Sequence, residues 1–179
     1  GVSFTLLFST NFADLISVRI AIGSGTAFLV AQLLDVKIFD QLRKTASLGI
    51  GFASVDEIER LNILKATLLS MQRAISSLTI KPEIIKIDGQ QVPKELENRA
   101  IAIVKGDQLV PEISAASIVA KVVRDDHMAL LNKKYPGYFW DRNVGYGVKA
   151  HFLALKSLGI TPSHRRSFKP IHNMLYEEN

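Results

Sequence analysis

The sequence predicts an α/β fold, a mixed sheet flanked by helices with a helical C-terminal region. Three observations predict it. Short β-branched and apolar runs bounded by turn residues indicate strands, apolar residues spaced three and four apart indicate amphipathic helices, and the two kinds of segment alternate along most of the chain. At 179 residues, with 47% apolar and 22% charged residues, the chain suits a single domain with its own core.

The first 36 residues are rich in β-branched and aromatic side chains and predict two or three strands. Further along, Ser54 and Glu57 fit a capping box, so a long helix is expected over 55–78 with one apolar stripe toward the core. The remaining predicted elements are a helix at 37–46, strands at 47–53, 83–88 and 100–105, helices at 112–134 and 148–158, a loop at 161–167 and a C-terminal helical tail.

The net charge of +5 is concentrated in the last third of the chain. Residues 121–179 carry ten basic and five acidic side chains, whereas residues 1–120 carry twelve of each. A basic region of this kind suits a polyanion-binding face, because each neutralised phosphate releases counterions. A solubilising surface is an equally good interpretation of the charge alone.

Cysteine is absent, which excludes disulfides, thiolate zinc sites and cysteine nucleophiles and suits a cytoplasmic protein. The apolar stretch 20–34 contains two glycines and is only 15 residues long, too short for a membrane-spanning helix. No positively charged region precedes the first apolar run, so no signal peptide is expected.

Two aspartates each follow an apolar strand directly, and each has a glycine beside it: Asp88 before Gly89, and Asp107 after Gly106. Strand ends are where open α/β sheets place ligands, and carboxylate oxygens suit Mg²⁺ or Mn²⁺. Phosphodiester cleavage commonly uses two such ions. From these residues alone, a simple turn at each Asp-Gly or Gly-Asp pair is the better interpretation.

Several motifs, taken together, resemble bacterial ribonuclease HII over about residues 37–170, and the run 105–125 is highly specific. The motifs are residues 62–67, Ile87-Asp88-Gly89, the run 105–125, Gly145-Tyr146-Gly147 and His164-Arg165-Arg166-Ser167-Phe168. On this basis the chain is identified as a member of that family, with a divergent segment at 1–36 and a tail at 171–179.

The resemblance implies an RNase H-like fold and an endoribonuclease, a hydrolase that uses Mn²⁺ or Mg²⁺. Its partners would be RNA/DNA hybrids or duplex DNA with embedded ribonucleotides, with the protein acting as a monomer. The family has four metal-site carboxylates, and Asp88 resembles the third and Asp107 the fourth. We expect these two carboxylates to converge within about 4–8 Å, close enough to share metal ions.

The resemblance also implies nucleic-acid contacts. Tyr146 is similar to the tyrosine that stacks on the sugar at the RNA-to-DNA junction, although a structural turn tyrosine is an alternative. Lys105 would meet a phosphate, and Ser114 would let a helix N-terminus approach an anion, with tight helix packing as the alternative. Arg165 and Arg166 would contact the backbone or act as internal braces. We expect Tyr146, Lys105 and one of these arginines on the same face as Asp88.

The sequence departs from the family at three places. No Asp-Glu pair or Gly-Arg-Gly turn, the source of the first two carboxylates and of 2′-hydroxyl contacts, occurs before Ser54. The family's Asp-Ser-Lys-Lys is reduced to Asp35-Val36-Lys37, and His-Lys before Gly-Tyr-Gly is replaced by Asn143-Val144. Asp56-Glu57 is no substitute, because the capping box explains it. Asp14 is the only other acid before Asp35.

Three functions therefore remain open. The chain is an active endoribonuclease, a catalytically impaired relative that binds hybrid duplex, or the product of a gene disrupted by frameshift or truncation within codons 1–36. The abrupt loss of resemblance before Lys37 favours the third over gradual divergence.

Overall fold

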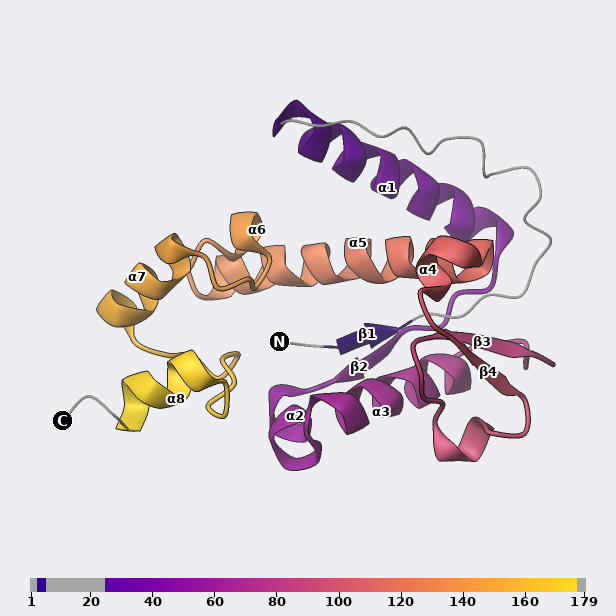
Figure 1. The fold of residues 1–179 in the computed structure, drawn as a ribbon. Helices are drawn as coiled ribbons and strands as arrows, with labels where there is room; N and C mark the ends of the chain where they lie inside the picture. The colour runs from indigo at the N-terminus through magenta and orange to yellow at the C-terminus, as the bar shows by residue number, and fades with distance from the viewer. Residues whose placement is uncertain (1–2, 6–24, 177–179) are drawn as a thin grey trace. The chain divides into compact units, whose positions relative to one another are not determined.

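The computed structural model describes the backbone of residues 3–5 and 25–176 and the side chains from Leu33 to Tyr176. The described chain divides into two compact units. One, which we call the sheet unit, contains residues 25–52 and 68–122; the other, the C-terminal unit, contains residues 53–67 and 123–176. Figure 1 gives the order of the elements. The expectation of a single domain stays a prediction.

Strand pairing confirms the α/β class. Strand β1 (Ser3–Thr5) pairs with β2 (Gly51–Ala53), and β3 (Ile85–Asp88) pairs in parallel with β4 (Ala100–Ile103), as the neighbouring arrows in Figure 1 show. The register sets Asp88 opposite Ile103, so both strands end at the same edge. The core of the sheet unit is the cluster of Met71, Ile75, Ile85, Ile87 and Leu96.

The first described helix, α1 (Gly25–Thr45), corrects the prediction of strands up to residue 36. The segment 25–34 contains alanine, leucine and glutamine, which are good helix formers, and only two β-branched residues, so the helix expected from 37 starts twelve residues earlier. Of the other predicted strand residues, only Ser3–Thr5 are described as a strand. The run 16–22 lies outside the described residues.

The long helix expected over 55–78 is two helices, α2 (Val55–Leu61) and α3 (Ile63–Ser76). Asn62 separates them with φ 70° and ψ 168°, which no helix accommodates. Its side-chain Oδ1 accepts the backbone N–H of Lys65 at 3.1 Å, so the residue that ends α2 also caps α3. Periodicity missed the break because the apolar spacing continues through it.

Strand β2 packs against α3 with almost no space between the backbones. A Cβ placed on Gly51 would lie 2.0 Å from the carbonyl oxygen of Ser70, so only glycine fits there. Beside it, Nη1 of Arg73 donates to the carbonyl of Phe52 at 2.6 Å. These contacts hold β2 against α3.

The predicted helices at 112–134 and 148–158 and the C-terminal helical tail are confirmed, with small shifts of their ends, as α5 (Pro111–Lys134), α7 (Lys149–Leu158) and α8 (Lys169–Tyr176). Three short helices were not predicted: η1 (Lys94–Leu96), α4 (Gly106–Leu109) and α6 (Trp140–Asn143). None of the described helices has the length and apolarity needed to cross a bilayer.

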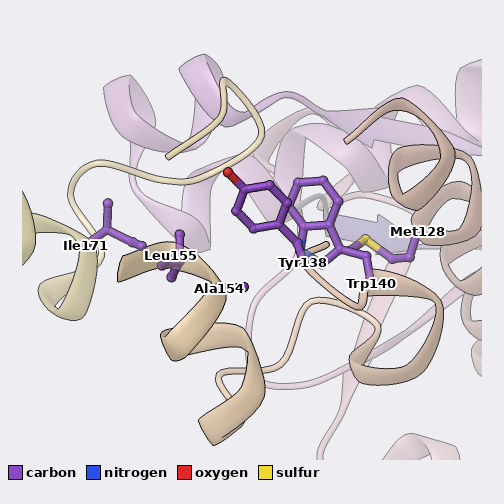
Figure 2. Packing of buried hydrophobic residues seen from close by; sticks show 6 residues of the cluster. All are labelled: Met128, Tyr138, Trp140, Ala154, Leu155 and Ile171. Carbon is purple, nitrogen blue, oxygen red and sulfur yellow. The ribbon is translucent and has the colours of Figure 1, made fainter. Parts of the chain in front are cut away.

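The core of the C-terminal unit is aromatic. Figure 2 shows Tyr138 and Trp140 side by side, with Met128, Ala154, Leu155 and Ile171 in the same cluster. The two rings stack with centroids 5.2 Å apart, and the Tyr138 hydroxyl donates to the carbonyl of Gly159 at 2.9 Å. A buried tyrosine needs such a partner for its hydroxyl.

Candidate functional site

Asp88 is the last residue of β3, and its carboxylate is tied to the end of the neighbouring strand. Its Oδ1 accepts the backbone N–H of Gly106 at 2.8 Å, while the residue as a whole is exposed. In addition, the backbone N–H of Gly89 donates to the carbonyl of Ile103 at 3.0 Å. One oxygen of Asp88 is thus oriented by the protein, and the carboxylate faces solvent.

The turn that follows β4 is tight. Lys105 is in the left-handed conformation, with φ 57° and ψ 36°, and it precedes α4. A Cβ on Gly106 would lie 2.6 Å from Cδ1 of Ile113 and 3.4 Å from Oδ1 of Asp88, so any other residue here would have to displace the end of the Ile113 side chain. Asp107 follows in the first turn of α4 and is half-buried.

The sheet unit therefore brings Asp88 next to the residue that precedes Asp107. Carboxylates that follow two adjacent parallel strands suit a hard divalent cation, which takes oxygen ligands. The distance of about 4–8 Å between the two carboxylates stays a prediction. Among the described side chains, no group of three or more His, Cys, Asp or Glu residues could hold a metal ion.

The N-terminus of α5 already has an anion close to it. Glu112 lies in the first turn, and a hydrogen bond from its own backbone N–H holds its pKa below the usual value against the opposing effect of burial. The ammonium of Lys86, 3.1 Å from its Oε1, lowers the pKa further. The backbone N–H of Ser114 donates to the carbonyl of Val110, so Ser114 would meet an anion through its hydroxyl.

Two of the acids considered as substitutes for the missing Asp-Glu, Asp35 and Glu57, have other partners. Asp35, on α1, forms an ion pair with Lys121 of α5. The capping box at Ser54 is confirmed: its hydroxyl accepts the backbone N–H of Glu57, and Glu57 accepts the backbone N–H of Ser54. Asp14 lies outside the described residues.

Tyr146 is exposed and stands on a braced turn in the C-terminal unit. Asn143 is buried; its Nδ2 donates to the carbonyl of Tyr138 at 2.8 Å and its Oδ1 accepts the backbone N–H of Gly145 at 2.9 Å. Asn143 thus holds the turn in place through two hydrogen bonds, at a position where the family has a basic residue. Val144 takes a left-handed conformation, φ 42°, which is unusual for a β-branched residue.

The loop with Arg165 and Arg166 is held from α2. The backbone N–H groups of Arg166 and Ser167 both donate to Oε1 of Glu59, the second over 3.2 Å. The guanidinium of Arg165 lies over the Phe168 ring, 5.2 Å from its centroid, so this arginine also braces the loop. Arg166 is exposed and available to a phosphate.

Two histidines are buried in the aromatic core of the C-terminal unit. Nδ1 of His164 accepts the backbone N–H of Thr161 at 2.9 Å, which assigns the ring proton to Nε2, 3.3 Å from Nε2 of His151. In turn, Nδ1 of His151 lies 3.1 Å from the carbonyl of Tyr138 and donates to it. Burial and then His151 lower the pKa of His164 to about 4. His164 is therefore neutral at pH 7, and the hydrogen bonds of the two rings are made within the core.

Sequence reasoning missed three residues around these sites: Glu59, Arg124 and Asp125. The last two close the highly specific run 105–125, which was the available signal. Asp88, Asp107, Lys105 and Ser114 lie in the sheet unit, whereas Tyr146, Arg165 and Arg166 lie in the C-terminal unit. That these two groups share one face therefore stays a prediction.

Comparison with known proteins agrees with these motifs. The family model of ribonuclease HII matches residues 26–171, which extends the resemblance from residue 37 into α1. The chain is 50% identical over 139 residues to ribonuclease HII of Roseobacter denitrificans, covering 78% of this chain and 70% of that protein. It is 54% identical over 160 residues to ribonuclease HII of Cereibacter sphaeroides, covering 89% and 76%.

A solved structure shares the fold. It is the complex of PCNA and RNase HII from Archaeoglobus fulgidus, with a TM-score of 0.63 and 21% identity over 90% of this chain and 78% of that one. This confirms the predicted RNase H-like fold. With the family match over residues 26–171, the conclusion is that the chain belongs to the ribonuclease HII family.

Proposed function

We propose that this chain is an endoribonuclease that hydrolyses the RNA strand of RNA/DNA hybrids, or duplex DNA at embedded ribonucleotides, and that it does so slowly. Membership of the ribonuclease HII family supports the reaction class. The observation that carries the site is the hydrogen bond from Gly106 to Asp88, which joins the ends of β3 and β4 where the two aspartates stand.

Asp88 and Asp107 are the proposed ligands of a divalent cation, Mg²⁺ or Mn²⁺. The donors fit: both are carboxylates, Asp88 is exposed, and its orientation is fixed through Oδ1. When bound, such an ion activates water for attack on the phosphodiester and stabilises the leaving oxygen. The chain itself orients Asp88 through Gly106 and holds Asp107 in the first turn of α4.

The slow rate follows from the acids that the sequence lacks. No Asp-Glu pair precedes Ser54, and the acid Asp35 is neutralised by Lys121. Two carboxylates leave a cation with most of its water ligands and cannot hold two cations at a fixed separation against their repulsion. Since positioned metal supplies much of this catalysis, binding should survive better than cleavage.

Duplex recognition is assigned to Tyr146 for stacking and to Lys105, Ser114, Arg165 and Arg166 for the sugar-phosphate backbone. The excess of basic over acidic side chains in residues 121–179, ten against five, supplies the electrostatic attraction. We further propose that the protein acts as a monomer in the cytoplasm, where its lack of cysteine is unremarkable.

Two measurements on the free protein test the site and the substrate separately. Mn²⁺ titration followed by electron paramagnetic resonance should show binding that Asp88→Asn and Asp107→Asn each weaken, with Asp126→Asn, on the exposed face of α5, as the matched control. Fluorescence anisotropy with a labelled RNA/DNA hybrid should give an affinity that falls with salt, with a log-log slope of about −3 to −4 for about four phosphate contacts. Equal Mn²⁺ binding by all variants would refute the metal site, and a salt-independent affinity would refute the duplex face.

A further inference from the structure

Arg124 makes two contacts with Tyr146, one with its ring and one with its hydroxyl. Its guanidinium carbon lies 5.8 Å from the centroid of the Tyr146 ring, within cation–π range, and its Nη1 donates to the Tyr146 hydroxyl over a long 3.5 Å. All of this lies within the C-terminal unit. The exposed ring of Tyr146 is thus contacted by Arg124 of α5.

Asp125 holds that guanidinium in place. Both Nε and Nη2 of Arg124 donate to Oδ1 of Asp125, at 2.9 and 2.6 Å. Adjacent residues of a helix do not normally face each other, so the arginine side chain must fold back along α5 to make this contact. The two side chains are only 26% and 16% exposed, which makes the pair more ordered than a surface ion pair.

We propose that Arg124 and Asp125 form a positioning pair that sets the orientation of the Tyr146 ring for stacking on the duplex. This rests on the proposed function, because the stacking role of Tyr146 belongs to it. The pair acts through Tyr146 and does not itself bind phosphate: the positive charge of Arg124 is already matched by Asp125, so little attraction is left for a backbone phosphate.

The chemistry also explains why the residue is arginine. A planar guanidinium can lie over an aromatic ring while its N–H groups reach a carboxylate, which a lysine ammonium cannot do with the same geometry. The turn beneath Tyr146 is fixed independently, because Asn143 holds Gly145 and the carbonyl of Tyr138. The ring orientation is therefore the degree of freedom that Arg124 controls.

The first test uses the free protein labelled with 3-fluorotyrosine and ¹⁹F NMR. The chain has four tyrosines, and Tyr146→Phe assigns the relevant signal. In Arg124→Ala and Arg124→Lys, the Tyr146 signal should move toward that of a free fluorotyrosine, while the other three stay in place. Emission from Trp140, the single tryptophan and a buried core residue, reports whether each variant is folded. An unmoved Tyr146 signal in a folded variant overturns the proposal.

The second test measures binding to a duplex with one embedded ribonucleotide in a double-mutant cycle. Arg124→Ala should weaken binding about two- to fivefold in the natural background and have no effect in Tyr146→Ala. The salt slope should be the same with and without Arg124. A loss that persists in Tyr146→Ala, or a slope that falls by about one, would make Arg124 a phosphate ligand and overturn the positioning role. If the unaltered protein binds no duplex, the proposed function fails, and the NMR measurement still decides whether Arg124 orients the ring.

Discussion

Lys105 stands in a backbone conformation that costs free energy. At φ 57° and ψ 36° it is left-handed, which disfavours a residue with a Cβ by about 1–2 kcal/mol. Replacing it with glycine removes this strain but gives the unfolded chain more freedom, which costs about 0.4–1 kcal/mol. The net expectation for Lys105→Gly is a gain of about 0.5–1 kcal/mol in the free energy of unfolding.

The same substitution should weaken duplex binding. If the Lys105 ammonium meets one phosphate, its loss reduces the salt slope by about 0.9 and the affinity about eightfold at 0.1 M salt. Lys105→Gly would thus be a more stable protein that binds its substrate less well. Strain retained at a position with this trade-off is characteristic of functional sites.

Urea unfolding and hybrid-duplex anisotropy measure the two effects on the same preparations. Lys105→Ala separates them, because it removes the charge and keeps the strain, so it should bind weakly without any gain in stability. Lys81→Gly is the matched control: Lys81 is an exposed lysine of the same unit without a positive φ, so glycine there should destabilise. A salt slope unchanged in Lys105→Gly would refute the phosphate contact, and a loss of stability equal to that of Lys81→Gly would refute the strain.

Two further predictions concern the buried His164 and the closely packed Gly106. The pKa of His164 is lowered from 6.5 to about 4, so between these values the unfolded chain takes up a proton that the folded one does not. The free energy of unfolding should therefore be constant above pH 6.5 and fall by up to about 2–3 kcal/mol as the pH drops to 4, and urea titrations should find this pH dependence reduced in His164→Gln. Gly106→Ala should cost about 1–3 kcal/mol and weaken Mn²⁺ binding, because the new methyl group would crowd Ile113 and the Asp88 carboxylate. Unchanged thermal unfolding of Gly106→Ala would contradict the close packing.

Local sequence patterns predicted the parts of the fold that local physics decides. The capping box at Ser54 satisfies backbone N–H groups within a few residues, and Pro111 lacks the N–H that would be unpaired at the start of α5. Both signals can therefore be identified without tertiary structure. The strands β3 and β4 could be found because they are apolar runs between turn residues.

The failures have equally specific causes. The break at Asn62 depends on one residue's positive φ, which does not interrupt the apolar spacing. The early start of α1 escapes prediction because residues 1–36 as a whole are rich in β-branched and aromatic side chains, whereas residues 25–34 contain alanine, leucine and glutamine.

The candidate site was predictable in its residue types and only partly in its contacts. Asp88 and Asp107 could be selected from strand ends and family motifs, but the hydrogen bond from Gly106 depends on the β3–β4 register. The pairing of Asp35 with Lys121, 86 positions away, and the contact of Arg124 with Tyr146 are products of packing that no local pattern encodes.

The central claim is that this chain retains the ribonuclease HII reaction at a much reduced rate through Asp88 and Asp107. The most direct test is single-turnover cleavage of a duplex with one embedded ribonucleotide, in Mg²⁺ and in Mn²⁺, beside ribonuclease HII of Cereibacter sphaeroides. Asp88→Asn is the matched control, since an amide oxygen can still accept the Gly106 N–H. We predict cleavage at least about 100-fold slower than that of the relative, equivalent to about 2.7 kcal/mol of barrier, and its loss in Asp88→Asn. A rate equal to the relative's, or cleavage that survives Asp88→Asn, would contradict the claim.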